Sequence, residues 1–416
     1  MDVKPVYLIM ITEQNNNKYY NCFPNGDGTF TVKYGRVGGH ESTTSYPMSK
    51  WNAQINSKIK KGYVDRSDLM TDVIEDSKVE PKKDSSDEFS VIKNTSVRDI
   101  IKRLFDFANK VVQSSYKVSA SVVTQSMIDT AQEYIDNLSN ECKNLSIEEF
   151  NKLLIKIFNT IPRKMDTVKN YLAKDTAEFT KIIEREQDTL DAMRGQVYKR
   201  IEKKEETSEE IVETASILEK MGITMEDATD EDVAKIKKAM GDSAHKFYKA
   251  WRVSNKETEK NYNKFVKENN IGNVQLLCHG SRNQNWFNIL KTGLKIRPAG
   301  AIITGAMFGY GIYWSNPSKY HGGVAKSIGY TSLGGYWTKD YQNCGFLAFF
   351  DVALGDSYDV YSFDSKYYNF DLNRLKKEKS NAWNLFAHGG TGMLRNDEII
   401  VYTDKQMTIR YLVEIR

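Results

Sequence analysis

Three apolar, strand-like runs in the C-terminal half of the chain each carry a polar side chain that could take part in chemistry. His279 lies in LLCHGS, Tyr313 lies in FGYGIYWS, and Glu398 opens an apolar run in NDEIIVY that should be buried. Gly280 would let a ligand approach the backbone closely, because glycine has no side chain. Each polar residue alone can equally be structural: a paired core histidine, a core tyrosine or an exposed glutamate. Their joint occurrence in this order indicates a candidate enzyme site with an imidazole, a phenol and a carboxylate.

Familiar catalytic and cofactor motifs are absent from the sequence. Gly309-Tyr310-Gly311 lacks the later glycine and the strand–helix context of a dinucleotide fingerprint, and no GxxxxGKS, GxxxxGKT, HExxH or GxSxG sequence occurs. The four cysteines are scattered and form no CxxC pair, which argues against a disulfide scaffold or a zinc module. Because no cluster has metal-ligand spacing, we expect that no metal is needed.

The segments around the three polar residues resemble the catalytic domain of the poly(ADP-ribose) polymerase family, whose fold is shared with diphtheria-like toxins. The matching blocks are LLCHGSRNQNWFNILKTGLKI, TGAMFGYGIYWS, AKSIGYTS, LAFFDVALGDSY and NDEIIVYTDKQMTIRYLVEI. They span roughly residues 211–416, and His279, Tyr313 and Glu398 occupy the family's three signature positions. The resemblance implies an ADP-ribosyltransferase that uses NAD⁺ as its substrate and folds around a mostly antiparallel, split β-sheet.

The chemistry implied by the resemblance is cleavage of the nicotinamide–ribose bond. This reaction passes through an oxocarbenium-like state comparable to that of glycoside hydrolysis. By resemblance, Glu398 would stabilise the developing positive charge and activate the incoming nucleophile, and His279 would hold the adenine-side ribose hydroxyl. Relatives that retain the glutamate can extend chains of ADP-ribose, though not always, so chain extension is permitted.

The nicotinamide pocket is also implied by the resemblance. Gly280 would pair its backbone N–H and C=O with the nicotinamide amide, and Ser327 would donate to the amide oxygen. Tyr330 and Tyr313 would sandwich the pyridinium-like ring, because the faces of aromatic rings attract a cation. Lys326, beside Ser327, is a further catalytic candidate.

Two weaker candidates are Ser281 and Lys295, for the adenosine and pyrophosphate side of NAD⁺. Lys295 stands where many relatives carry arginine, and an ammonium cannot bind phosphate in a bidentate manner. Tyr310 replaces a lysine that is common in the nuclear members of the family.

The N-terminal residues 1–70 alternate apolar and polar positions between turns, which predicts a small β-rich module. This module resembles a WGR domain, in which Tyr34-Gly35-Arg36 stands for the Trp-Gly-Arg motif. A tyrosine can still stack on an exposed sugar or base, and Arg36 would contact phosphate or couple the module to the helical segment. Residues 1–63 carry eight Lys and Arg against four Asp and Glu. A basic module can bind a polyanion, although an excess of lysine more often serves solubility.

The middle of the chain, residues 95–200, follows the helical period. Capping boxes are predicted at Ser146 with Glu149 and at Asp175 with Glu178. This segment resembles the regulatory helical domain that restrains activity in DNA-dependent members of the family. The alternative is an unrelated helical bundle.

Mixed structure is expected after the helical segment. We predict helices over 211–221 and 230–252. Strands are then expected at VQLLCHGS, GYGIYWS, GFLAFFDVALG, DEIIVYT and MTIRYLVEIR.

The length and composition of the chain set its class. A chain of 416 residues favours two or three domains, and no run of 18 apolar residues predicts a membrane span. The first residues read as a strand and not as a signal peptide. An intracellular protein is expected, in the nucleus of a eukaryote or in the cytoplasm or nucleoid of a bacterium or phage-infected cell.

The sequence therefore predicts an α+β multidomain protein. Its expected parts are a WGR-like DNA-binding domain (1–75), a linker (76–94), a helical regulatory domain (95–207) and an ADP-ribosyltransferase catalytic domain (208–416). It would be stimulated by DNA strand breaks or ends, modify acceptor proteins including itself, release nicotinamide and serve DNA repair. One alternative is a mono-ADP-ribosyltransferase acting on nucleic acid ends, or an NAD⁺ glycohydrolase. The other is a DNA-binding scaffold with weak catalysis.

Overall fold

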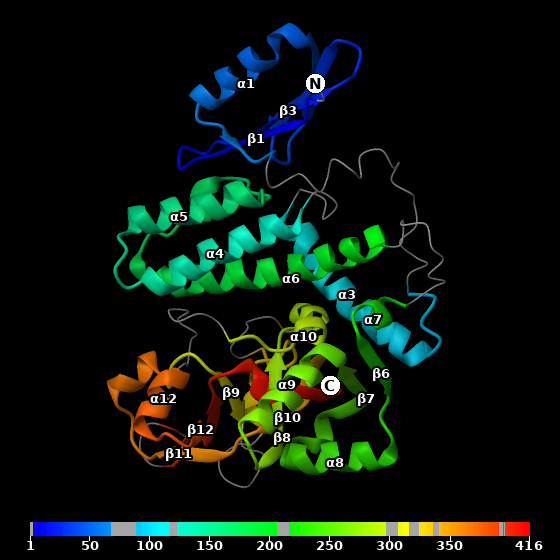
Figure 1. The fold of residues 1–416 in the computed structure, drawn as a ribbon, viewed down its shortest axis with the longest axis vertical. Coiled ribbons are helices and arrows are strands. Elements are labelled where there is room, and N and C mark those ends of the chain that lie inside the picture. The colour runs from blue at the N-terminus through cyan, green and yellow to red at the C-terminus, as the bar shows by residue number, and fades with distance from the viewer. Residues whose placement is uncertain are drawn as a thin grey trace. The chain divides into compact units, whose positions relative to one another are not determined.

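The computed structural model describes two compact units (Figure 1). The first unit contains residues 1–84 and 109–203, and the second contains residues 85–108 and 204–416. The described residues are 3–67, 89–116, 123–205, 216–296, 307–315, 324–335, 341–390, 394 and 396–416. Most of the expected linker, 76–94, and part of the charged stretch 199–210 therefore lie outside the described residues. No helix of the described part is long and apolar enough to cross a membrane.

The first unit begins with an antiparallel five-stranded sheet in the order β4-β3-β2-β1-β5. Its strands are β1 Val6–Ile11, β2 Asn17–Pro24, β3 Thr29–Arg36, β4 Glu41–Pro47 and β5 Val64–Asp65. The helix α1 (Trp51–Lys60) packs on this sheet through Trp51, whose ring meets the edge of Phe30 at 5.0 Å between ring centroids. The predicted β-rich module is therefore present, with one helix packed on its sheet.

Helices make up the rest of the first unit. They are the end of α3 (Thr95–Ser115), α4 (Gln125–Glu141), α5 (Ile147–Thr160) and α6 (Phe179–Glu205). The predicted capping box at Ser146 and Glu149 is confirmed at the start of α5. The second predicted box is wrong in detail, because Asp175 accepts from Ala177 N–H while Glu178 accepts from Lys174 N–H.

Buried amides join the sheet of the first unit to its helical segment. Asn159 accepts a hydrogen bond from Ile11 N–H at 3.0 Å and donates to Ile11 O at 3.3 Å. Asn17, which is fully buried, donates to Arg163 O at 3.2 Å. Buried polar groups of this kind are costly to separate, since each would lose its partner. The β-rich module and the helices α4 to α6 therefore form one structural unit.

The second unit is built on a nine-stranded sheet in the order β11-β12-β13-β9-β8-β10-β14-β7-β6. Every pairing in it is antiparallel except that of β11 with β12. The strands are β6 Ile223–Asp227, β7 Phe247–Asn255, β8 Val274–Ser281, β9 Ile312–Ser315, β10 Gly345–Ala353, β11 Asp356–Val360, β12 Ala382–Ala387, β13 Glu398–Val401 and β14 Met407–Ile415. The mostly antiparallel α+β architecture predicted for this part is therefore confirmed.

The nine-stranded sheet has a narrow junction in its middle. Strands β8 and β9 are joined by a single residue pair, Cys278 with Ser315, whereas β8 and β10 pair over eight residues from Val274 to Ser281. The junction divides the sheet into a four-stranded part and a five-stranded part. Both parts contribute strands to the candidate site.

Helices lie around this sheet. They are α7 Ile217–Lys220, α8 Asp230–Met240, α9 Lys256–Glu268, α10 Trp286–Thr292, α11 Ala325–Gly329 and α12 Leu372–Glu378. The predicted helix over 230–252 is wrong in its second half, because residues 247–255 form β7, which pairs with β14 and β6. Short 3₁₀ turns are η1 Met48–Lys50, η4 Val168–Asn170, η5 Thr176–Glu178, η6 Gly241–Lys246, η7 Asn283–Asn285, η8 Ser365–Asn369 and η9 Asp404–Gln406.

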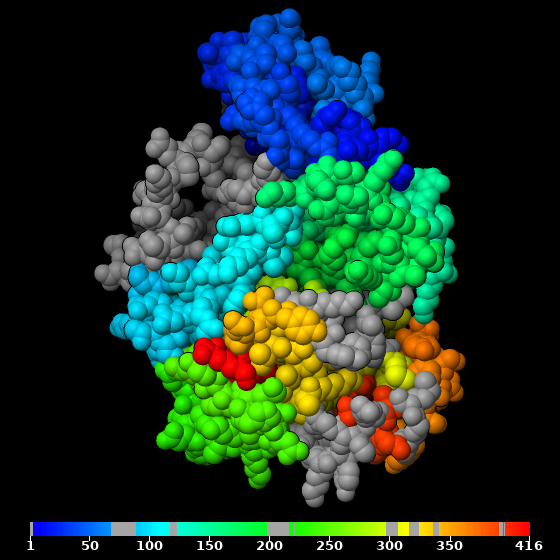
Figure 2. Space-filling model, turned by 180° about the vertical axis from the view of Figure 1, so that it is seen from behind, coloured from blue at the N-terminus to red at the C-terminus, as the bar shows by residue number. Residues whose placement is uncertain are grey.

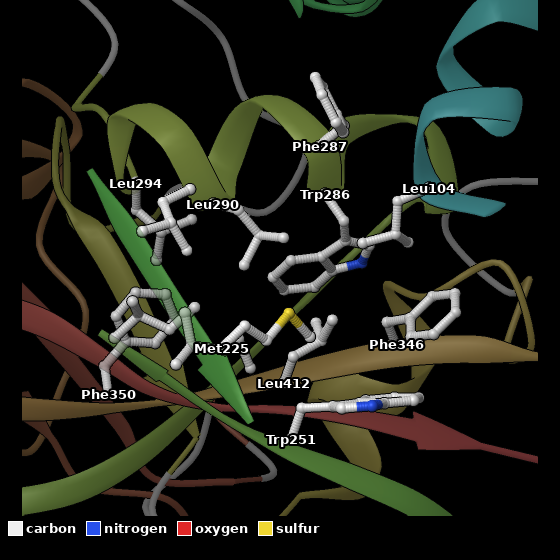
Figure 3. Packing of buried hydrophobic residues seen from close by; sticks show 14 of the residues in the cluster. Leu104, Met225, Trp251, Trp286, Phe287, Leu290, Leu294, Phe346, Phe350 and Leu412 are labelled. Atoms are coloured by element: carbon white, nitrogen blue, oxygen red, sulfur yellow. The ribbon is translucent and has the colours of Figure 1, made fainter. Parts of the chain in front are cut away.

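The first half of α3 belongs to the hydrophobic core of the second unit. Leu104 is fully buried and lies in one cluster with Trp286 of α10 and Phe346 of β10 (Figure 3). Phe105 meets Phe287 edge-on at 5.6 Å between ring centroids. The apolar stripe predicted from the helical period therefore has its partner surface in the C-terminal unit.

A buried carboxylate fixes the same half of α3. Arg103 donates two hydrogen bonds to Glu414 of β14, at 2.8 and 3.1 Å, and Glu414 is 1% exposed. Arg416 also donates to Glu414, at 2.9 Å. In the space-filling view the last residues of the chain (red) lie beside the cyan surface of α3 (Figure 2). Removing α3 would leave the Glu414 charge in an apolar interior with fewer partners, which is unfavourable.

Candidate active site

Three neighbouring strands carry the three signature residues. Glu398 starts β13, Tyr313 lies in β9 and His279 lies in β8, and these strands follow one another in the sheet. Glu398 is the cross-strand partner of Ser315, and Ile400 is the partner of Tyr313. Residues far apart in the sequence are thus brought to the junction between the two parts of the sheet.

His279 is held as a neutral imidazole. Burial lowers its pKa to about 4, although the carbonyl of Tyr313 acts in the opposite direction. The ring nitrogen Nδ1 lies 3.3 Å from this carbonyl oxygen. A carbonyl can only accept, so we assign the proton to Nδ1, which leaves Nε2 as an acceptor. An acceptor nitrogen suits a ligand hydroxyl.

The hydroxyl of Tyr313 is occupied by the neighbouring loop. It accepts from Phe308 N–H at 2.9 Å and donates to Gly309 O at 3.0 Å. Burial raises the pKa of Tyr313 above its ordinary value, and the nearby phenol of Tyr330 raises it further. Tyr313 is therefore an uncharged residue that can offer a ligand its ring face.

Glu398 is a buried carboxylate with one oxygen engaged. Lys326 of α11 donates to its Oε1, whereas Oε2 has no hydrogen-bond partner among the described residues. The residue is 5% exposed. A buried carboxylate oxygen without a donor is energetically unfavourable, and such atoms are commonly functional. Glu398 Oε2 can accept from a ligand hydroxyl or face a developing positive charge.

Ser327 and Gly280 lie where α11 meets β8. The hydroxyl of Ser327 donates to Cys278 O at 3.3 Å and lies 2.8 Å from the hydroxyl oxygen of Ser315. A side chain at position 280 would clash with the carbonyl of Ser327, so only glycine fits this approach. Tyr330 follows α11 and donates its N–H to Ser327 O at 3.1 Å.

The remaining predicted ligand contacts are less closely connected to this group. Ser281 ends β8, and its hydroxyl accepts from Asn285 at 3.1 Å. Lys295 has an exposed side chain that pairs with Asp404 at 3.0 Å. The hydroxyl of Tyr310 donates to Asn369 at 3.0 Å.

Two further residues of the site, Ser315 and Tyr402, are not predicted from the sequence. Ser315 sits two positions after Tyr313, and side chains at that spacing in a strand point to the same face, so strand alternation could have identified it. Tyr402 donates its hydroxyl to Phe308 O at 2.7 Å and thereby helps to fix the loop that Tyr313 also binds. No local pattern marked Tyr402.

The predicted DNA-binding residues lie in β3 of the first unit. Tyr34 is 37% exposed, and its ring lies 5.8 Å from that of Tyr20. A side chain at Gly35 would clash with His40 O. Arg36 donates to Asn15 O, to Asn15 Oδ1 and to Asp166 O, each at 3.0 Å. Of the two roles considered for Arg36, the contact with the helical segment is therefore observed.

The donor and acceptor set at the sheet junction fits NAD⁺ as a substrate. Glu398 Oε2 and His279 Nε2 can accept hydrogen bonds from ligand hydroxyls, and the ring of Tyr313 can offer a face to a cationic ring. Within the described residues, no group of three or more His, Cys, Asp and Glu is placed to hold a metal ion.

Comparison with known proteins agrees with this geometry. The family model described as the poly(ADP-ribose) polymerase catalytic domain matches residues 229–416. Two similar proteins come from Invertebrate iridescent virus 6. "Uncharacterized protein 101L" is 34% identical over 47% of this chain and 78% of its own length, and "Putative poly(ADP-ribose) polymerase-like 100L" is 31% identical over 41% of this chain and 87% of its own length.

A human protein, poly(ADP-ribose) polymerase 2, is 31% identical over 38% of this chain and 29% of its own length. The chain thus covers most of each viral relative but under a third of the human one. With the family match and the residues gathered at the sheet junction, these similarities show that the chain belongs to the poly(ADP-ribose) polymerase family.

Proposed function

We propose that the protein transfers ADP-ribose from NAD⁺ to protein side chains, including its own acidic or serine side chains, and releases nicotinamide. The observation that carries this proposal is the buried Glu398 carboxylate, whose Oε2 lacks a donor while Oε1 is paired with Lys326. A carboxylate in this state is poised to stabilise positive charge on a ribose without reorganising.

The proposed reaction uses the chain's residues in two steps. Gly280 and Ser327 bind the nicotinamide amide while the ring lies between Tyr313 and Tyr330. As the bond from the ribose carbon to the nicotinamide nitrogen breaks, its electron pair leaves with nicotinamide and positive charge develops on the ribose. Glu398 stabilises this charge and accepts the proton of the attacking nucleophile, while His279 holds a ribose hydroxyl. Retention of Glu398 permits extension of the product into chains.

DNA dependence is the regulatory part of the proposal. The sheet that carries Tyr34 shares buried hydrogen bonds with Asn159 of α5 and, through Asn17, with Arg163 just after this helix. This connection supports transmission of DNA binding from the sheet to the helices, which would restrain the enzyme until broken DNA binds. A DNA-stimulated enzyme would act where DNA is exposed, in a nucleus or a nucleoid, in a DNA repair role.

The acceptor and the DNA dependence can be tested in one assay. Purified protein is incubated with NAD⁺ labelled in the adenylate group, with and without nicked DNA, and the label is separated into protein, DNA and free ADP-ribose. The proposal expects labelled protein, in larger amount with nicked DNA. Label on DNA would instead support a transferase that modifies nucleic acid ends. Label only in free ADP-ribose would support an NAD⁺ glycohydrolase, and absence of turnover a scaffold.

The lowered pKa of Lys326 predicts that activity is lost at alkaline pH. Burial lowers its pKa from the ordinary value of 10.5 to about 8. The ammonium that faces Glu398 is charged below this pH and is lost above it, so turnover is expected to fall as the pH rises through about 8. Lys326→Arg keeps its charge because a guanidinium does not titrate in this range, and it should move the fall to higher pH. Lys366→Arg, at a surface ion pair with Glu378, is the matched control. If the turnover of Lys326→Arg falls at the same pH as that of the wild type, the loss of activity is due to the titration of another group.

Substitutions of the exposed ring of Tyr34 are expected to change the affinity for DNA. Tyr34→Ala should weaken the affinity for nicked DNA by roughly five- to a hundred-fold, which corresponds to the loss of one stacked base or sugar. Tyr34→Trp should strengthen it, because indole offers more stacking area. Fluorescence anisotropy with labelled nicked DNA at fixed salt measures both. Tyr248→Ala removes another exposed tyrosine and serves as the control. Unchanged affinity in both Tyr34 variants would refute the assignment.

A further inference from the structure

Ser315 occupies the centre of the candidate site. It pairs with Glu398 of β13 on one side and, across the junction, with Cys278 of β8 on the other. The residue is 6% exposed. Its hydroxyl lies 2.8 Å from that of Ser327, which is its only hydrogen-bond partner among the described residues.

The protons of the two hydroxyls can be assigned by counting donors. A serine hydroxyl has one proton to donate and two lone pairs that accept. Ser327 lies 3.3 Å from Cys278 O, which can only accept, so the proton of Ser327 is directed to this carbonyl. Both hydrogen bonds can exist together only if Ser315 donates to Ser327. The result is a chain running from Ser315 to Ser327 to an acceptor oxygen.

We propose that Ser315 is a positioning residue for the nicotinamide amide. Resting on the proposed function, the inference is that Ser315 donates to Ser327 and so directs the single Ser327 proton toward an acceptor. When a carboxamide oxygen enters the site, this proton turns from Cys278 O to the ligand while the bond from Ser315 is kept. No covalent bond changes in this step.

The donated bond has two consequences for affinity. A hydroxyl that already accepts a hydrogen bond is a stronger donor, because the bonds of a chain polarise one another. Without Ser315, the Ser327 proton is less well directed, and its oxygen loses a donor in a buried environment. The affinity for the nicotinamide end of the substrate should therefore depend on Ser315, whereas the affinity for the ADP-ribose end should not.

The test compares two ligands and four forms of the full chain. Calorimetry measures the binding of nicotinamide and of ADP-ribose, which lacks the nicotinamide group, to the wild type, Ser315→Ala, Ser327→Ala and the double variant. Ser315→Ala should weaken nicotinamide roughly five-fold and change ADP-ribose affinity by less than about two-fold. In the Ser327→Ala background, Ser315→Ala should have no further effect, because the acceptor of its proton is missing. Ser254→Ala, another strand serine with a paired hydroxyl, is the matched control.

The outcomes separate this inference from the proposed function. Wild-type affinity for nicotinamide in Ser315→Ala, equal weakening of both ligands, or additive effects in the double variant would each overturn the role of Ser315. In those cases the proposed function would stand. A wild-type protein that binds neither nicotinamide nor NAD⁺ would overturn both. If Ser315→Ala does not fold, Ser315→Cys replaces it. Its thiol is similar in size but a weaker donor, so nicotinamide should still weaken measurably, and unchanged affinity would overturn the inference.

Discussion

Glu398→Gln is expected to lower the rate of ADP-ribosyl transfer by at least about a hundred-fold, while NAD⁺ affinity changes by less than about three-fold. The amide oxygen can still accept from Lys326, so the local structure should be kept. The amide nitrogen would replace the free oxygen and remove the negative charge that faces the ribose. An interaction that strengthens in the transition state affects turnover more than binding. Single-turnover rates and calorimetry measure the two quantities separately.

Glu398→Asp is the matched variant for this prediction. It keeps the charge but withdraws it by one methylene group, so its rate should lie between those of the wild type and Glu398→Gln. Equal losses of affinity and turnover in Glu398→Gln would assign Glu398 to ground-state binding. A rate near that of the wild type would remove Glu398 from the chemistry altogether.

Leu104→Ala is expected to destabilise the second unit by about 2–5 kcal/mol, the usual cost of a cavity left by a large apolar side chain. Leu104 is fully buried against Trp286 and Phe346. Because Arg103 also binds the buried Glu414, a chain that starts near residue 211 should lose the fold of its catalytic unit. Denaturant unfolding followed by tryptophan fluorescence measures the change for Leu104→Ala.

Leu138→Ala is the matched control for this prediction. Leu138 is an equally buried leucine, but it lies in α4 of the first unit. Its removal should affect the unfolding of that unit and leave NAD⁺ binding by the second unit intact. If Leu104→Ala changes stability by less than about 0.5 kcal/mol, residues 89–108 are not part of the catalytic core. The restraining role of the helices is accordingly tested in a chain that keeps the whole second unit, residues 85–108 and 204–416, and lacks the whole first unit.

The strands were predictable where their apolar runs are unbroken. The run GFLAFFDVALG contains β10, near the centre of the sheet. A strand that is buried on both faces is apolar throughout, so its sequence stands out as an unbroken apolar run. The helix predicted over 230–252 includes residues 247–252 because it begins in a lysine- and alanine-rich stretch. The pairing of β7 with β14 decides its conformation, and no local propensity reports a partner about 160 residues away.

The sequence also could not predict that the two halves of α3 belong to different units. Its apolar stripe predicted a buried face but could not identify the surface that covers it, and half of the helix proves to pack on the catalytic unit. At the site, the types of His279, Tyr313 and Glu398 and the family resemblance indicated candidates. The sequence could not reveal that Tyr313 donates its hydroxyl to Gly309 O, because this depends on the conformation of the loop before β9. It also could not reveal that Ser315 pairs with two strands, because this depends on strand order.

The most direct test of the account follows both halves of NAD⁺ in one reaction. The substrate carries one label in nicotinamide and another in the adenylate group, and the full chain is assayed with nicked DNA. We predict that free nicotinamide and protein-bound ADP-ribose form in a one-to-one ratio, and that both nearly vanish in Glu398→Gln. Nicotinamide release without any transfer to protein, or no release by a folded protein that binds NAD⁺, would contradict it.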